Sequence, residues 1–195
     1  TGYDTFGYVF FQTLVLDQKG NIILLTRAPD LRQAQNTSNI QDIRIWVDKD
    51  GINPTDDLKI ILEELDLKNK NIGVEYEAYG MTGRNALKLN RSLDNYCKVV
   101  DQSELITKLR VIKSNEELVY VKRAAELADK ALDEAWKYTK AGASEAKILA
   151  EMQKAVLEGG GDYPANEYII GSGHNALLCR YQAEKRNLSD TDQLS

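Results

Sequence analysis

The stretch that most constrains the fold covers residues 109–129, with the sequence LRVIKSNEELVYVKRAAELAD. Ser114 followed by Glu117 matches a capping box, in which the hydroxyl and the carboxylate satisfy each other's exposed backbone amides. Apolar residues then recur at steps of three and four, which predicts a helix with one buried stripe. That stripe consists of Leu118, Val121, Ala125, Ala128, Leu132 and Ala135. The stretch separates two styles of sequence and therefore predicts a domain boundary.

Residues 1–108 contain short strand patterns that alternate with helix patterns. Runs rich in β-branched and aromatic residues predict strands, and a polar loop that ends at Gly20 joins the first two as a hairpin. The predicted strands cover residues 8–16, 21–26, 42–47, 72–76 and 97–100. Pro54 opens one predicted helix and Thr82 caps another. This order predicts an α/β (α+β) fold, with a mixed sheet and helices packed on it.

The sequence after residue 138 predicts one more helix and then a turn-rich segment. Ser144 is expected to cap this helix, and the three glycines at 159–161 are expected to end it. Residues 168–170 and 176–180 are predicted strands on either side of the Gly-Ser-Gly turn at 171–173.

Composition excludes several classes of function. The net charge is −5, from 30 acidic and 25 basic residues without a long run of either sign, so a nucleic-acid partner is not expected. Apolar runs are too short to span a bilayer, so no membrane partner is expected either. Two cysteines and no visible export signal favour a cytoplasmic location.

The residues alone assemble no catalytic constellation. His174 is the single histidine, so a multi-histidine zinc site is excluded. Its Gly-Ser-Gly-His-Asn turn favours exposure, either as a solvated residue or at a pocket rim. The segment GSGHNA matches a dinucleotide fingerprint in form, but about twenty residues remain after it, too few for the βαβ unit that such a site needs. Nucleotide binding is therefore rejected.

Several motifs in order carry a resemblance to a known family. LR-x-IKS-x-x-E-L, AAELAD, the Gly142-x-x-Glu145 turn, GGGDYP and IIGSG resemble the creatinase/aminopeptidase P family, which includes the Xaa-Pro dipeptidases of peptidase family M24. TGYD near the start and GVEYE in the middle of residues 1–108 are further landmarks, so the resemblance covers essentially the whole chain. The ALLCRY segment is most similar to the creatinase and ectoine-hydrolase-like branch.

The resemblance implies a domain layout. Residues 1–108 would be a creatinase-type N-terminal domain, a ribonuclease-H-like mixed sheet with helices, which lacks its first helix and strand. Residues 109–195 would be the first part of a pita-bread catalytic domain. The chain would thus be an internal fragment, with Asp192 just before the strand that carries the family's first metal ligand. The expected metal site, with two Mn or Co ions, or a metal-free site as in creatinase, would belong to the full-length protein, and no ligand is expected in this chain.

The resemblance also implies substrate-binding candidates. The position where peptidase members place a histidine is occupied by Arg180, whose guanidinium could bind a carboxylate of the substrate in a bidentate manner. A surface arginine without such a role is the alternative. His174 at the turn, and Tyr8 and Phe10 in the aromatic strand, are further candidates for the substrate rim.

The function expected from the resemblance is a hydrolase that cleaves a C–N bond in a small dipeptide or amino-acid derivative. A homodimer is expected, and the isolated chain is expected to be inactive, with no catalytic residue of its own. The alternative is a non-catalytic peptide- or protein-binding module on the pita-bread fold.

Overall fold

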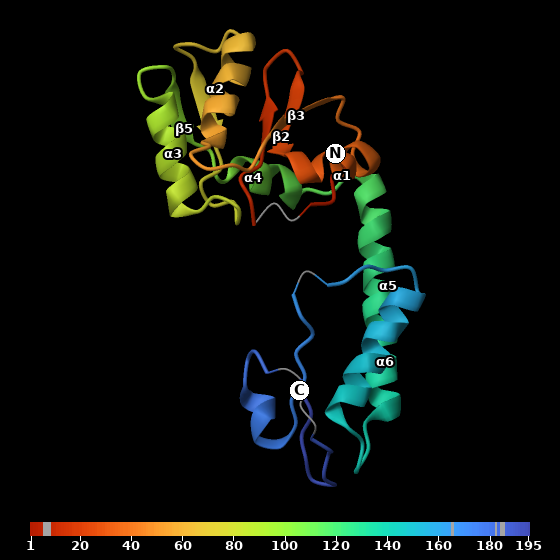
Figure 1. Ribbon diagram of the computed structural model, residues 1–195. Helices are drawn as coiled ribbons and strands as arrows, with labels where there is room; N and C mark the ends of the chain where they lie inside the picture. Colours follow the sequence, from red (N-terminus) through yellow and green to blue (C-terminus); the bar gives the residue numbers. More distant parts are fainter. Residues whose placement is uncertain (6–8, 165, 182, 184–185) are drawn as a thin grey trace. The chain divides into compact units, whose positions relative to one another are not determined.

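The computed structural model describes residues 1–5, 9–164, 166–181, 183 and 186–195. The chain divides into two compact units, Thr1–Ile112 and Lys113–Ser195, which are described separately below (Figure 1). The division falls within residues 109–129, the stretch for which the sequence predicts a domain boundary. The predicted domain limits, residues 1–108 and 109–195, stay predictions.

The first unit is built on short strands. β1 (Thr13–Leu16) pairs antiparallel with β2 (Ile22–Arg27), and β2 pairs parallel with β3 (Asp42–Trp46), which makes a mixed sheet. β4 (Asn71–Val74) and β5 (Lys98–Asp101) form a parallel pair. The predicted hairpin and all five predicted strands are present, but β1 is shorter than its pattern predicts.

Helices of the first unit begin where local signals place them. α2 starts at Pro54, and α3 starts after Thr82, whose hydroxyl accepts a hydrogen bond from the backbone N–H of Asn85 at 3.2 Å. The predicted helix start at Pro54 and the predicted cap at Thr82 are therefore confirmed. The helices are η1 (Ala28–Asp30), α1 (Leu31–Thr37), α2 (Pro54–Glu64), α3 (Gly83–Leu93) and α4 (Leu105–Val111).

The core of this unit lies between the sheet and helices α2 and α3, which lie side by side in Figure 1. Trp46 is buried there, and its indole N–H donates to the backbone carbonyl of Phe11 at 3.0 Å. The pairing of Val15 with Ile23 puts both on the core face of the sheet. The other buried members are Leu25, Leu58, Ile61, Leu62, Leu89, Leu93 and Tyr96.

The second unit is a pair of helices followed by an irregular segment. α5 (Asn115–Tyr138) begins with the predicted capping box, since Ser114 accepts from the amide of Glu117 while the Glu117 carboxylate accepts from the amide of Ser114. α6 (Glu145–Glu158) starts after Ser144, but the Ser144 side chain makes no capping hydrogen bond. α5 and α6 pack along each other (Figure 1).

The predicted buried stripe of α5 is wrong except for Ala135. The buried residues of this helix are Leu127, Ala131 and Ala135, at steps of four. Leu118, Val121 and Leu132 are 42–50% exposed. The helix has two apolar faces, and α6 covers the one centred on Ala131. Sequence periodicity indicates the face through Leu118, Val121 and Leu132, whose side chains stay about half exposed in the described part of the chain.

The two strands predicted after α6 are also absent from the described part of the chain. Residues 168–170 belong to no strand, and the chain from Gly173 to Leu177 forms the 3₁₀ helix η2. Gly173 and Asn175 favour tight turns, and this turn chemistry outweighs the strand preference of the apolar residues that follow. Within the described residues, no helix is long and apolar enough to cross a membrane.

Candidate functional site

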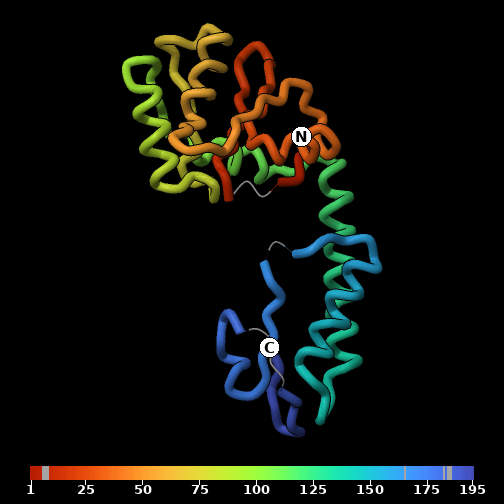
Figure 2. The backbone as a smooth tube through the Cα atoms, viewed as in Figure 1, coloured from red at the N-terminus to blue at the C-terminus, as the bar shows by residue number. Residues whose placement is uncertain are grey.

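The turn at residues 171–173 is held by the last residues of the chain. Gly171 and Ser195 exchange two backbone hydrogen bonds of 3.0 Å, and the amide of Gly173 donates to the carbonyl of Gln193 at 3.0 Å. Ser172 and Leu194 form an antiparallel bridge. Figure 2 shows the chain folding back after α6 so that its C-terminal residues run beside this turn. Ser172 and Leu194, which are 22 positions apart, thus lie in one short antiparallel pair of segments.

A fully buried carboxylate lies under this turn. Glu145, the first residue of α6, has 0% exposure, and its Oε1 accepts from the amide of Ser172 at 2.8 Å and from the hydroxyl of Ser172 at 2.5 Å. Its Oε2 is buried and has no hydrogen-bond partner among the described residues. The backbone amide of Glu145 donates to the carbonyl of Arg186 at 3.1 Å. The start of α6 is therefore tied to both the turn and the C-terminal segment.

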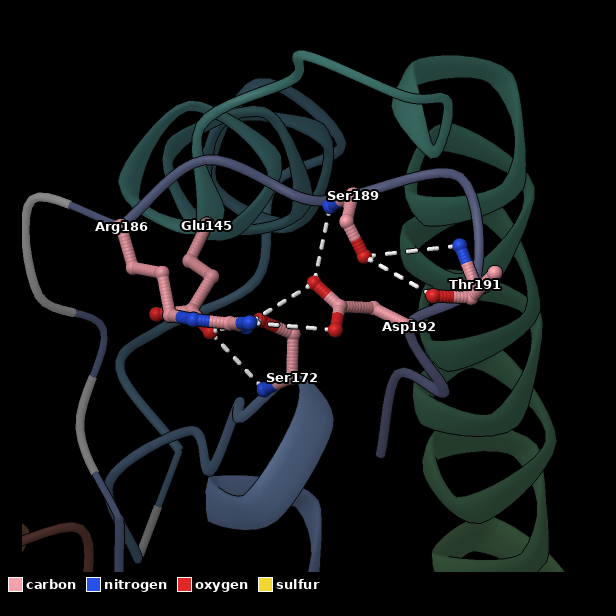
Figure 3. Close-up of polar contacts among 6 residues, drawn as sticks. All are labelled: Glu145, Ser172, Arg186, Ser189, Thr191 and Asp192. Carbon is pink, nitrogen blue, oxygen red and sulfur yellow. Dashed lines mark hydrogen bonds and ion pairs between the residues drawn. The ribbon is translucent and has the colours of Figure 1, made fainter.

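Arg186 extends this contact into a network (Figure 3). Its Nη1 donates to the hydroxyl of Ser172, and its Nη2 donates to Oδ1 of Asp192 at 3.0 Å. Asp192 also accepts from the amide of Ser189 at 2.8 Å. The hydrogen bond from Arg186, and then the one from Ser189, hold the pKa of Asp192 below its ordinary value, and Asp192 raises the pKa of Arg186. We call Glu145, Ser172, Arg186 and Asp192 the Glu145 network.

The glycines on either side of Ser172 are required by close approach. A Cβ at residue 171 would lie 2.5 Å from the carbonyl oxygen of Asn175. Gly173 has a φ of +58°, and a Cβ there would lie 2.9 Å from Oδ1 of Asp192 and 3.0 Å from Nη2 of Arg186. The Gly-Ser-Gly motif is thus explained by packing of the turn against η2 and the Glu145 network.

The residues predicted from sequence as substrate-binding lie apart from this network. His174 is exposed on η2, and Arg180 is exposed in the turn that follows η2. Phe10 belongs to the first unit, where it packs against the core with the guanidinium of Arg27 3.4 Å from its ring centroid. Tyr8 lies outside the described residues. All four roles stay predictions.

Sequence reasoning did not predict the Glu145 network. In the sequence, Glu145, Ser172 and Asp192 stand out only as landmarks of the family resemblance. The available signal was the position of Glu145 at the first residue of a predicted helix, which the helix dipole alone explains. Neither the burial of this carboxylate nor its partner Arg186 follows from local pattern.

The described residues do not form a metal centre. They include no group of three or more His, Cys, Asp or Glu side chains that could hold a metal ion. Glu145 and Asp192 do not fit a divalent cation, because the guanidinium of Arg186 already binds Asp192 and the serine that Glu145 holds. The contacts of the Glu145 network position backbone segments.

Comparison with known proteins identifies the family to which the chain belongs. Residues 1–112 match the model of the creatinase/prolidase N-terminal domain, and residues 120–195 match the model of metallopeptidase family M24. The chain therefore belongs to the creatinase/prolidase family, as the sequence motifs predict. The predicted fold class is confirmed as well: an α/β creatinase-type N-terminal domain with a mixed sheet, followed by the first part of a pita-bread domain.

Individual relatives agree with this assignment. The chain is 32% identical over 89 residues to an Xaa-Pro dipeptidase of Pyrococcus furiosus, a match that covers 46% of this chain and 26% of the dipeptidase. It is 24% identical over 199 residues to ectoine hydrolase of Halomonas elongata, with 90% of this chain and 48% of that enzyme covered.

A solved structure shows the same fold. The X-Pro aminopeptidase of Thermotoga maritima superposes with a TM-score of 0.77 at 20% identity, over 93% of this chain and 48% of that one. The chain spans about half the length of these last two relatives.

Proposed function

We propose that this chain is part of a hydrolase that cleaves an amide or peptide C–N bond in a small dipeptide or amino-acid derivative. The observation that carries the proposal is the order of the two family matches, the creatinase/prolidase N-terminal domain followed directly by the start of metallopeptidase family M24. An Xaa-Pro dipeptidase and ectoine hydrolase among the relatives support the substrate class.

The remaining parts of the proposal concern the whole protein. In this chain, the N-terminal domain would cover residues 1–108, and the first part of the catalytic domain would cover residues 109–195. A metal site with two Mn²⁺ or Co²⁺ ions, or a metal-free site as in creatinase, would use residues that this chain does not contain. Such ions, when bound, activate a water and polarise the substrate carbonyl. The protein would act as a cytoplasmic homodimer.

The test compares the 195-residue chain with the product of the complete gene. The substrates are Gly-Pro, Met-Pro and an N-acetylated amino acid, each with and without Mn²⁺ or Co²⁺. We expect hydrolysis by the complete protein and none by the 195-residue chain. A folded complete protein that hydrolyses none of these substrates but binds an Xaa-Pro peptide would refute the enzyme and favour a binding module.

Arg180 is proposed to bind an anionic group of the substrate. Its side chain is exposed on the turn after η2, and a guanidinium can bind a carboxylate with two parallel hydrogen bonds. Arg180→Ala in the complete protein should raise KM for a dipeptide about tenfold or more, the factor for a lost charge-assisted hydrogen bond, with a smaller effect on a substrate amidated at its C-terminus. Arg91→Ala, which removes an exposed arginine of α3, is the control. An unchanged KM for Arg180→Ala would show that Arg180 does not bind the substrate carboxylate.

A further inference from the structure

Glu145 stands out because burial of a carboxylate is costly unless hydrogen bonds compensate for the lost water. It is the one carboxylate among the largest fully buried side chains of the described residues. Among the described residues, the Glu145 side chain accepts two hydrogen bonds. Both come from Ser172, one from its backbone amide and one from its hydroxyl. The hydrogen bonds of this carboxylate therefore hold the turn at residues 171–173 in place.

The hydroxyl of Ser172 links Glu145 to Arg186. A serine hydroxyl has one proton to donate. Since that proton is used on Glu145, the oxygen lone pairs are left to accept from Nη1 of Arg186. The other terminal nitrogen of Arg186 binds Asp192. The donors thus run in one direction from Arg186 through Ser172 to Glu145, and Asp192 is held at the other end.

Two members of this series of hydrogen bonds, Ser172 and Asp192, lie in or next to the two segments that pair. Ser172 is the central residue of the turn, and Asp192 directly precedes Gln193, whose carbonyl accepts from Gly173. η2 starts at Gly173 and carries His174. A displacement of Ser172 would therefore move the turn, the start of η2 and the register of residues 193–195 together.

We propose that Glu145 is a positioning residue, which fixes the turn at residues 171–173 and the segment at 193–195 against each other through Ser172 and Arg186. The link to catalysis, through the placement of His174 at the substrate rim, rests on the proposed function. The positioning itself rests on the contacts alone, so it is tested without substrate.

The experiment is residue-resolved amide hydrogen exchange on the 195-residue chain with Glu145→Gln, which removes the charge and keeps the shape. We expect exchange at Ser172, Gly173 and Ser195 to become roughly five- to tenfold faster, as for the loss of a charge-assisted hydrogen bond. The amide proton of Ser172 should also shift upfield. Amides of α5 and α6 should keep their rates within about twofold.

Glu158→Gln is the matched control, since it makes the same chemical change at an exposed position of α6 and should leave all rates unchanged. Two results would overturn the proposal: unchanged exchange at the three amides in Glu145→Gln, or equal acceleration throughout α5 and α6, which indicates a general stabilising role. If Glu145→Gln does not fold, Ser172→Ala decides. It keeps the backbone amide but breaks the link to Arg186, and unchanged exchange at Gly173 and Ser195 would again refute the role. A positive exchange result with no hydrolysis by the complete protein would refute the proposed function alone.

Discussion

Replacing Gly173 with alanine tests how closely the turn packs against the Glu145 network. Gly173 has a φ of +58°, and an added Cβ would lie within 3.2 Å of Asp192 Oδ1 and of both terminal nitrogens of Arg186. Gly142 provides the control, because its φ is +81° and no described atom lies within 4 Å of an added Cβ. The two substitutions share a left-handed backbone and differ in their contacts.

The expected magnitudes follow from this difference. A non-glycine residue in the left-handed region costs about 1–2 kcal/mol, and the stiffer unfolded chain offsets about 0.4–1 kcal/mol of it. Gly142→Ala should therefore lower the free energy of unfolding by roughly 0.5–1 kcal/mol. Overpacking adds about 1–3 kcal/mol, and the lower end applies at residue 173 because the crowded atoms are side-chain ends. Gly173→Ala should thus cost about 2 kcal/mol.

Urea unfolding followed through the amide signals of α5 and α6 measures the free energy of this unit separately from the first unit. Equal m-values for the two variants would show that the unfolded states are comparable. If Gly173→Ala destabilises no more than Gly142→Ala does, the close approach of the turn to Arg186 and Asp192 is wrong.

Two further predictions concern the same unit. Ser114→Ala should lower the free energy of unfolding by about 1 kcal/mol, because it removes a capping box, whereas Ser144→Ala should have little effect because that hydroxyl makes no capping bond; equal effects in urea titrations would contradict this. The pKa of Asp192 is lowered by Arg186, so the stability it contributes is present above its unfolded pKa of about 3.8 and is lost as pH falls through the lower folded value. The urea midpoint should therefore fall on acidification below about pH 4, less so in Arg186→Met, and parallel curves for the two proteins would contradict the pairing.

The elements that sequence predicts well are those set by neighbouring residues. The capping box of Ser114 and Glu117, the cap at Thr82 and the start of α2 at Pro54 each depend on three or four consecutive positions. The same is true of the hairpin between β1 and β2, whose loop is closed by the side chain of Asp17 accepting from the amides of Lys19 and Asn21. Local chemistry is sufficient for these features.

The features that sequence does not predict depend on distant partners. Periodicity shows that α5 has an apolar face through Leu118, Val121 and Leu132, but it cannot show that α6 covers a different face. The Glu145 network joins residues up to 47 positions apart, 145 and 192, through side-chain conformations that no local pattern specifies. The family motifs point to Gly142, Glu145 and the Gly-Ser-Gly turn without saying what they contact.

The positions of the Glu145 network in the sequence also predict an order in which the second unit forms. α5 and α6 are neighbours in the chain, so their packing requires closure of only a short loop, and it can form early. Glu145 finds its partner Ser172 only later in the sequence, and Arg186 and Asp192 come later still. We therefore expect the helical pair to form first during synthesis, with this carboxylate in water, and the burial of the carboxylate to come last. A chain cut before Arg186 should keep the helices and lose the turn.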